Sequence, residues 1–475
     1  MQVTIAHLSE ANKNERIDSQ FFLPEFVDSF NTVANGPYSM LSDIAHVTDG
    51  NHVKIAENFD DSEGIRYLRG QDLGTDMMLH DRNIVHIPES CFKALKRSHI
   101  FKDDILITIV GANTGLVGLV YEPSEKLVAN CKLGIARVEI SKIIPGYLYA
   151  FLIGRYGQHQ ILRSIRGGGQ TGLILPDIRQ LRIARLSSDF ESRINDVSFY
   201  GHSKAMESKR VYGNAQNILL SELGLTDWQP KRQLTFVKNY SDTEHVERID
   251  AEYYQPKYEE IVNAIKAYKG GWDTLGNLVT VKKCVEVGGG EYLEEGIPFV
   301  RVSNLSPFEI TEEKYISEKL YAEIKQHQPK KGEILFSKDA TPGIAYYLNE
   351  QPRKMIPSGG ILRLKIKKDK ADKVNNEYLT LALNSILTKE QANRDVGGSV
   401  ILHWRPDQVK GTLIPILSED KQTEIQQKVI ESFNLRKKSK RLLECAKRAV
   451  EMAIEQDEKK AINWLENATK EMQIE

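Results

Sequence analysis

The chain has 475 residues, of which 27% are charged and 41% hydrophobic, and its formal net charge is −1. This length exceeds what one hydrophobic core organises, so we expect two or three domains of ordinary globular composition. The balanced charge excludes a globally basic nucleic-acid-binding protein, and the four scattered cysteines, without a CxxC pair, argue against a zinc ribbon or a disulfide framework.

The sequence predicts a cytoplasmic protein without membrane association. The N-terminal segment, MQVTIAHLSEANKNERID, lacks the basic-then-apolar order of a signal peptide. Unpaired, scattered cysteines favour a reducing compartment. The longest uncharged stretch, residues 105–121, is slightly too short to span a bilayer, and its GANTG turn favours a strand–turn–strand reading.

Three kinds of segment follow one another in the first half of the chain. Residues 1–37 form an arm whose RIDSQFFLP motif places two aromatic residues before a proline, and we expect these rings to pin the arm to a globular domain. Residues 38–186 mix short alternating strands with helices, which is an α+β pattern. Residues 187–226 predict a long helix with a capping box of Ser188 and Glu191.

The second half of the chain repeats the first. The RID motif begins at Arg16 and again at Arg248, 232 residues later, and Pro176-Asp177 recurs as Pro406-Asp407, 230 residues later. A repeat of this length indicates a duplicated domain and not a solenoid unit. We therefore expect a connecting arm, a second α+β domain, a second long helix and a helical tail, at residues 227–271, 272–417, 418–456 and 457–475.

Both long helices carry a stripe of small residues at heptad spacing. Gly201, Ala205 and Ser208 belong to the first stripe, and Ser432 and Ser439 belong to the second. Small residues let two helices approach closely. We therefore predict that the two long helices pack against each other as a pair.

The chain lacks the usual motifs of nucleotide, metal and methyl-transfer sites. It has no GxxxxGK[ST] loop, no GxGxxG after a strand, no [DN]PP[YF] loop and no histidines at metal spacing. Pro406-Asp407 followed by residues 419–421 resembles the PD…ExK order of nucleases, but these acids begin a long helix, where a central strand is needed. We therefore expect a non-catalytic chain that binds neither a metal nor a cofactor.

Several motifs nevertheless resemble those of one family. In the first half, LSDIAHVTDGNHVK precedes GIRYLRGQDL, and in the second, LGNLVTVKKCVEVGGGEYLEEGIPFVRVSNL stands at the matching place. DILITIVGANTGLVGLV and GGGQTGLILPDIRQLRI follow in the first half. In their order and duplication these segments resemble the specificity (S) subunit of type I restriction-modification systems. The second half lacks the TDGxH turn, so no contact role passes to Lys283 or Cys284.

This resemblance implies a phage-defence protein with two target recognition domains, each of which reads one half of a split double-stranded DNA sequence. It implies that the two long helices form an antiparallel coiled coil, and with approximate two-fold symmetry residues 205–208 would cross near residues 436–439. The pair would be a spacer on which adenine methyltransferase subunits assemble, with restriction or translocase subunits as further partners. S-adenosylmethionine is then expected on the methyltransferase subunits and not on this chain. A helix of about 35 residues spans ~50 Å, or roughly 15 base pairs of DNA.

The candidates for DNA contact lie in the motifs that resemble the family and in the two glycine-rich loops. Glycine permits close backbone approach, and Arg and Asn pair with base edges. Because alternate strand residues face opposite sides, we do not expect both Arg66 and Arg69 to face DNA. The candidates are, in the first half, Asp49, Asn51, His52, Arg66, Arg69, Gln71, Arg166, Gln170 and Thr171, and in the second, Arg301, Ser303, Asn304, Lys338, Arg394, Ser399 and His403.

Two other interpretations remain open on the residues alone. The chain is also compatible with a protein-interaction scaffold of a phage-defence complex that reads no sequence, or with the recognition subunit of another type of restriction system. The glycine-rich loops equally fit ordinary flexible connections. An adenine methyltransferase encoded beside this chain would favour the type I reading.

Overall fold

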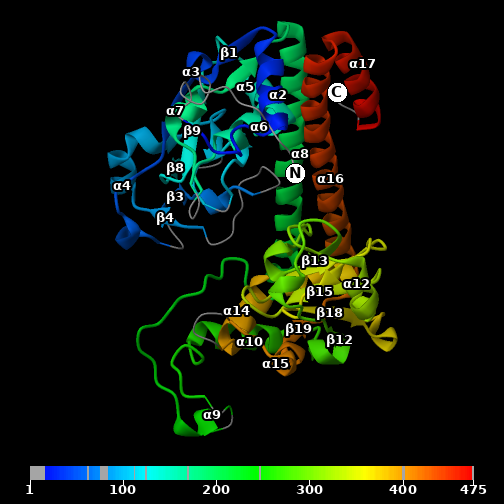
Figure 1. Ribbon diagram of the computed structural model, residues 1–475. Coiled ribbons are helices and arrows are strands. Elements are labelled where there is room, and N and C mark those ends of the chain that lie inside the picture. The colour runs from blue at the N-terminus through cyan, green and yellow to red at the C-terminus, as the bar shows by residue number, and fades with distance from the viewer. Residues whose placement is uncertain are drawn as a thin grey trace. The chain divides into compact units, whose positions relative to one another are not determined.

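The structure, a computed structural model, describes residues 16–60, 64–74, 84–111, 113–123, 126–167, 171–244, 246, 248–397 and 402–472. The chain divides into two compact units (Figure 1). The first contains residues 1–206 and 435–475, and the second contains residues 207–434. Each unit therefore includes an α+β region and one part of each of the two long helices, α8 (Ser188–Glu222) and α16 (Glu419–Glu455).

The α+β region of the first unit consists of short strands and helices in alternation. Its two larger sheets have the strand orders β2-β9-β6-β7 and β4-β3-β8-β5, and β1 pairs with β10. The helices are α2 (Pro24–Ala34), α3 (Leu41–Ile44), α4 (Glu89–Ala94), α5 (Pro145–Ile153), α6 (Arg155–Ser164) and α7 (Leu175–Arg179). The strands are β1 (Tyr38–Met40), β2 (Ala45–Asp49), β3 (Ile65–Leu68), β4 (His86–Ile87), β5 (His99–Ile100), β6 (Ile105–Thr108), β7 (Val117–Leu119), β8 (Leu127–Ala129), β9 (Leu133–Val138) and β10 (Arg182–Ala184).

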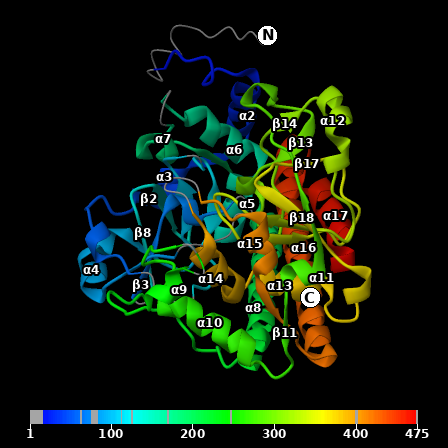
Figure 2. The ribbon, with the colours of Figure 1, turned by 90° about the horizontal axis from the view of Figure 1, so that it is seen from below.

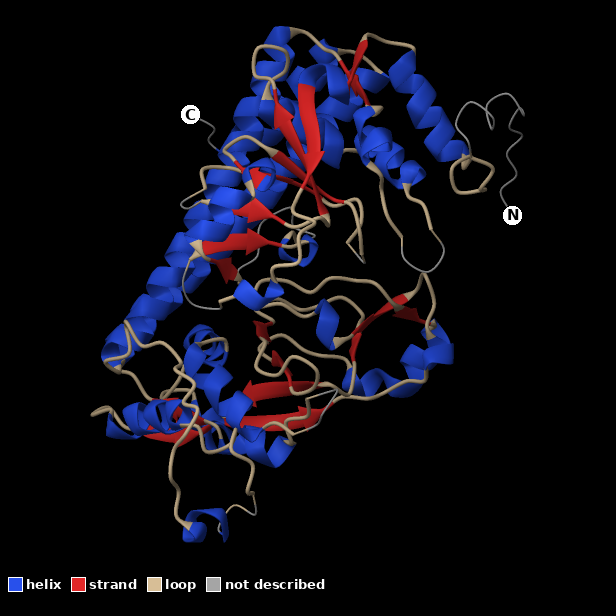
Figure 3. Ribbon diagram, turned by 90° about the vertical axis from the view of Figure 1, so that its left-hand side faces the viewer, coloured by secondary structure: helices blue, strands red, loops and turns tan. Residues whose placement is uncertain are grey.

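The second unit repeats this topology, except that among its described residues no strand corresponds to β5. Its sheets have the orders β12-β18-β15-β16 and β14-β13-β17, and β11 pairs with β19. Figure 3 shows the strands and helices of the chain by colour. The helices are α9 (Tyr240–Glu244), α10 (Pro256–Ala267), α11 (Leu275–Leu278), α12 (Glu318–Ile324), α13 (Asn376–Leu383), α14 (Ile386–Asp395) and α15 (Pro406–Gly411). The strands are β11 (Trp272–Thr274), β12 (Val279–Lys283), β13 (Ile297–Val300), β14 (Tyr315–Ile316), β15 (Ile334–Ser337), β16 (Ala345–Tyr347), β17 (Ile356–Pro357), β18 (Ile361–Ile366) and β19 (Leu413–Pro415).

The duplication extends to individual pairings and contacts. In each unit one strand pair is parallel, β3 with β8 and β13 with β17, whereas the neighbouring pairs are antiparallel. A buried tyrosine ties the central helix to the last strand in both units, since the hydroxyl groups of Tyr147 and Tyr378 donate to Ala184 O and Pro415 O at 2.6 Å. The predicted α+β class and internal duplication are therefore confirmed.

The core of each unit explains why its segments adopt these elements. Every residue of α5 is buried, so this helix is apolar all round and lies inside the first unit. All four residues of β6 are buried, as expected for a central strand covered on both faces. The long helices complete both cores: Phe190 and Ala446 belong to the first, and Leu219 and Ile425 to the second.

Within each unit the two long helices run antiparallel. In the second unit Ser208 contacts Ser432, and Glu222 forms an ion pair with Lys421 at 3.4 Å. Residue numbers therefore rise along α8 while those of the contacting residues of α16 fall. In the first unit Gly201 packs against Leu443. The predicted antiparallel orientation is confirmed. The contact of Ser208 with Ser432 lies about one turn from the expected crossing with residues 436–439.

The start of α8 differs from the predicted capping box. Ser187, and not Ser188, caps the helix: its Oγ accepts from Phe190 N at 3.3 Å. Glu191 is buried and instead accepts from Arg185 Nε at 3.2 Å. The difference arises because Glu191 turns towards the residues that precede the helix, where an arginine neutralises it.

The arm helix of each unit packs beside the helix that precedes the glycine-rich loop. Thus α2 contacts α6, and α10 contacts α14 (Figure 2). The arm rings Phe21 and Tyr254 are both 8% exposed, which agrees with their expected role as anchors. Among the residues that the structure describes, no helix is both long and apolar enough to cross a membrane.

Candidate nucleic-acid interface

The TDGNH turn of the first unit packs tightly against the connection between β8 and β9. Gly50 N donates to Leu133 O at 3.0 Å, and Asn51 N donates to Ala129 O at 2.8 Å. A Cβ added to Gly50 would lie 2.1 Å from Asn130 O. Only glycine allows this approach, so the turn sequence itself positions the side chains beside it.

A buried carboxylate in this turn holds two exposed donors. Asp49 accepts from His52 Nε2 at 2.6 Å and from the Arg97 guanidinium. Burial raises the pKa of Asp49, but the hydrogen bond from His52 and the charge of Arg97 outweigh this effect, and the pKa is lowered. The side chains of His52 and Arg97 are 61% and 64% exposed. The turn therefore presents an imidazole and a guanidinium on a fixed base.

Other candidates of the TDGNH and RGQDL motifs are structural. Asn51 is buried and donates to Val53 O at 2.8 Å and to the Tyr67 hydroxyl at 3.3 Å, so its amide shapes the turn. Arg66 is 7% exposed within β3. By their exposure, neither side chain is available to a ligand at the surface.

After β3 the chain returns to the surface. Arg69 forms an ion pair with Asp72 at 3.2 Å, and its side chain is 21% exposed. Gln71 is exposed. Arg66 and Arg69 therefore differ in exposure, and Gln71 is the most accessible candidate of this motif.

The base of the first glycine-rich loop is a short ladder. Arg166 and Gly172 exchange backbone hydrogen bonds at 2.8 and 2.9 Å. The Arg166 guanidinium forms a bidentate pair with Asp177, at 2.9 and 2.8 Å. Thr171 is exposed beside this ladder. Gln170 lies outside the described residues.

The second unit also has an acid with two donors, built from different segments, and this acid is only partly buried. Asp339, at the end of β15, pairs with the ammonium of Lys338 and with His403 Nδ1 at 2.9 Å. The side chain of His403 is 62% exposed and that of Lys338 is 16% exposed. His403 thus resembles His52 in its chemistry, although the two histidines occupy different places in the repeated fold.

The loop after β13 meets the same region. A Cβ added to Gly360 would lie 2.9 Å from Val302 Cγ2 and 3.5 Å from Asp339 Cβ, so glycine permits close packing of the three segments. Ser303, beside Val302, is exposed. The structure therefore brings Ser303, Lys338 and His403 to one end of the β12-β18-β15-β16 sheet.

Arg301 and Asn304 support this loop. Asn304 is 5% exposed, accepts from Arg301 N at 3.1 Å and donates to Glu313 at 3.3 Å. The Arg301 guanidinium pairs with Glu313, and this hydrogen bond lowers the pKa of Glu313. Both candidates are therefore occupied within the protein.

Arg394 lies at the end of α14, where its Nε donates to Asp395 Oδ1 at 3.0 Å. Its guanidinium lies 5.4 Å from the centre of the Tyr253 ring. Ser399 lies outside the described residues. Arg394 is thus placed next to the arm and not next to His403.

Four residues of these contacts were not among the sequence candidates. Arg97 and Asp339 meet Asp49 and His403 only through the fold, 48 and 64 residues away. The arm arginines Arg16 and Arg248 did carry a signal, since both belong to the repeated RID motif. Within the described ranges, no group of three or more His, Cys, Asp or Glu side chains is arranged to hold a metal ion.

The comparisons with known proteins identify the class of these domains. Residues 270–444 match the family model of the type I restriction modification DNA specificity domain. The first half repeats the same strand order, so the resemblance to type I specificity subunits is confirmed. Domains of this family recognise and do not catalyse, which agrees with the expected non-enzymatic chain. The comparison with curated proteins finds no match.

Solved structures with similar folds include two specificity subunits. The S subunit of a type I system from M. genitalium has a TM-score of 0.37 and 13% identity, over 88% of this chain and 94% of that one. The HsdS subunit from Thermoanaerobacter tengcongensis has a TM-score of 0.30 and 14% identity, over 89% of this chain and 97% of that one. The type IIG restriction endonuclease BpuSI is similar over 41% of this chain and 30% of its own length, with 9% identity and a TM-score of 0.30.

Proposed function

We propose that this chain reads a bipartite, asymmetric DNA sequence as the specificity subunit of a type I restriction-modification complex. One observation carries the proposal: two copies of one frame present different exposed donors. His52, Gln71 and Thr171 belong to the first copy, and Ser303 and His403 to the second. Side chains of this kind contact phosphates and base edges. Unlike donors on a repeated frame favour two unlike half-sites.

The long helices support a spacer between the half-sites. α8 has 35 residues and α16 has 37. At ~1.5 Å per residue each helix is about 50–55 Å long, which corresponds to roughly 15 base pairs. The adenine methyltransferase subunits, which carry S-adenosylmethionine, would assemble on this chain, and restriction or translocase subunits would join them.

The decisive experiment is methylome sequencing of cells that express the chain with its cognate methyltransferase. We expect a methylated adenine in each of two unlike half-sites separated by an unread gap of constant length. Catalytically inactive methyltransferase provides the control. A palindromic motif would refute the asymmetric reading, and the absence of any motif would favour the alternative of a scaffold that reads no sequence.

A further inference from the structure

The repeated RID motif places an arginine on the end of a helix in each unit. Arg16 donates to Ser164 O at 3.1 Å and to Ile165 O at 2.9 Å, at the end of α6. These are carbonyl groups that the helix itself leaves without donors, and a cation there also opposes the negative end of the helix dipole. The arm thus caps a helix more than a hundred residues further along the chain.

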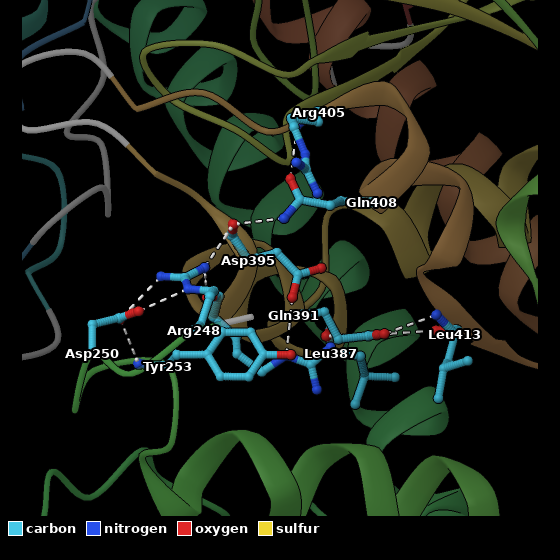
Figure 4. A network of polar contacts seen from close by, with 10 residues as sticks. Arg248, Asp250, Tyr253, Leu387, Gln391, Asp395, Arg405, Gln408 and Leu413 are labelled. Atoms are coloured by element: carbon cyan, nitrogen blue, oxygen red, sulfur yellow. Dashed lines mark hydrogen bonds and ion pairs between the residues drawn. The ribbon is translucent and has the colours of Figure 1, made fainter. Parts of the chain in front are cut away.

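Arg248 does the same in the second unit (Figure 4). Its Nη1 donates to Arg394 O at 3.2 Å and to Asp395 O at 3.1 Å, at the end of α14. Gln408 adds a bond to Asp395 O at 3.0 Å. An arm arginine therefore donates to two carbonyl groups at the helix end in both units, through both terminal nitrogens in Arg16 and through Nη1 alone in Arg248.

An aspartate two residues later fixes each guanidinium. Asp18 accepts from Arg16 Nε and Nη2 at 2.7 and 2.9 Å, and Asp250 accepts from Arg248 at 2.8 and 3.0 Å. The same carboxylates accept from the backbone of the third residue beyond, at 3.1 Å in both units. This bidentate geometry requires the planar fork of arginine and excludes lysine.

An aromatic ring joins the arm arginine to the helix. Phe21 lies 4.7 Å from the Arg16 guanidinium and 3.9 Å from that of Arg163 on α6. Arg163 Nε also donates to Phe21 O at 2.8 Å. The ring of Tyr253 takes the same position, 4.6 Å from Arg248 and 5.4 Å from Arg394. The arm therefore packs directly against the helix end in both units.

The glycine-rich loop begins directly after each capped carbonyl. Ile165 precedes Arg166, which pairs with Gly172, and Asp395 stands two residues before Gly397, which pairs with His403. A shift of the helix end would move these ladders, and with them Thr171 in one unit and His403 in the other. Both units thus share an arm arginine at the helix end, whereas the loops that follow differ.

We propose that Arg16 and Arg248 are positioning residues, each of which sets the base of one glycine-rich loop and thereby the reading of one DNA half-site. This inference rests on the proposed function. Each arginine acts through the last carbonyl groups of its helix and does not contact DNA. The duplicated arm thus serves both recognition domains independently.

The test compares Arg16→Gln and Arg248→Gln in the complete complex with methyltransferase. We expect Arg248→Gln to reduce discrimination against base changes in one half-site about tenfold, as loss of a charge-assisted bond suggests, and to leave the other half-site unchanged. Arg16→Gln should do the reverse. Arg248→Lys, which keeps the charge but not the fork, should show a smaller loss. The matched control is Arg232→Gln, because that arm side chain is 74% exposed.

A second measurement separates this inference from the proposed function. Hydrogen exchange of the Gly397 and His403 amides, without DNA and far below the Tm of each variant, should accelerate in Arg248→Gln and not in Arg232→Gln. Unchanged exchange would overturn the proposal that Arg248 holds the loop base, as would an equal loss of discrimination at both half-sites. Faster exchange together with full discrimination between bases would show that the position of the loop base does not affect recognition of the half-site. A wild-type complex without any methylation motif would refute the proposed function instead. The exchange measurement would still test whether Arg248 holds the loop base.

Discussion

At the scale of single residues, exposure divides the candidate side chains into two groups. His52 and His403 are each held by an aspartate, Asp49 or Asp339, and remain more than half exposed. Asn51, Arg66 and Asn304 are each less than 9% exposed and serve the protein's own packing and hydrogen bonding. The first group is suited to contact a ligand, because its anchoring leaves a polar edge towards solvent.

Substitution of one member from each group should therefore have opposite effects. His403→Ala should lower methylation of targets by a factor that corresponds to about 1–3 kcal/mol, with little change in Tm. Asn304→Ala should lower stability by about 1–3 kcal/mol because it leaves buried partners unpaired. Methylation assays and thermal unfolding of both variants distinguish these outcomes. A large drop in Tm for His403→Ala would show that this histidine is structural.

The Arg248–Asp250 pair predicts a pH dependence of stability. The hydrogen bond from Arg248 lowers the pKa of Asp250 below its ordinary value of 3.8. Because the folded-state pKa is depressed, the stabilisation is present above the unfolded pKa and is lost as the pH falls through the folded pKa. Asp250→Asn should thus lower the urea midpoint at pH 7, and this difference from the wild type should shrink below pH 3.8. If the difference in urea midpoint grew on acidification, the predicted direction of the pH dependence would be wrong.

At the scale of elements, the helix pair depends on small residues at its contacts. Ser208 Oγ donates to Ser432 O at 2.8 Å, and Ser432 Oγ donates to Ser208 O at the same distance. Both serines are buried. Each hydroxyl group thus donates to a backbone carbonyl of the other helix, so the helices approach closely without large apolar side chains between them.

A larger side chain at this contact should force the helices apart. Ser432→Leu is expected to cost about 1–3 kcal/mol through overpacking and to remove the hydroxyl that donates to Ser208 O. Glu431→Leu, at the adjacent exposed position, is the matched control and should change stability little. Urea denaturation of both variants tests this. Equal stability of the two variants would be inconsistent with the close contact.

At the scale of the whole molecule, the balanced charge limits what the chain does alone. A net charge of −1 supplies little of the electrostatic attraction that DNA binding generally needs. We expect the isolated chain to bind DNA weakly and to gain affinity with methyltransferase subunits. Fluorescence anisotropy at moderate salt, with and without these subunits, measures the gain. Tight sequence-specific binding by the purified chain alone would refute this expectation.

The helix length should set the distance between the half-sites. Inserting one turn into both α8 and α16 adds about 6 Å and should lengthen the unread gap by about one to two base pairs. The bases of both half-sites should stay the same. As a control, exchanging residues 38–186 for the same region of a relative should change one half-site and not the gap. A gap that is insensitive to the insertion would exclude the spacer role.

The sequence by itself determined the duplication, the α+β class and the pairing of the long helices, because these depend on local periodicity and on motifs repeated along the chain. The antiparallel orientation followed from the resemblance to a known family. It also pointed to the RID motif, whose arginine and aspartate pair within three residues. Only the tertiary structure decided which candidates are accessible. Arg66 is buried by the strands beside it, whereas Asp339 acquires His403 from a segment 64 residues away. Exposure and long-range pairing arise from packing, which no short stretch of sequence encodes.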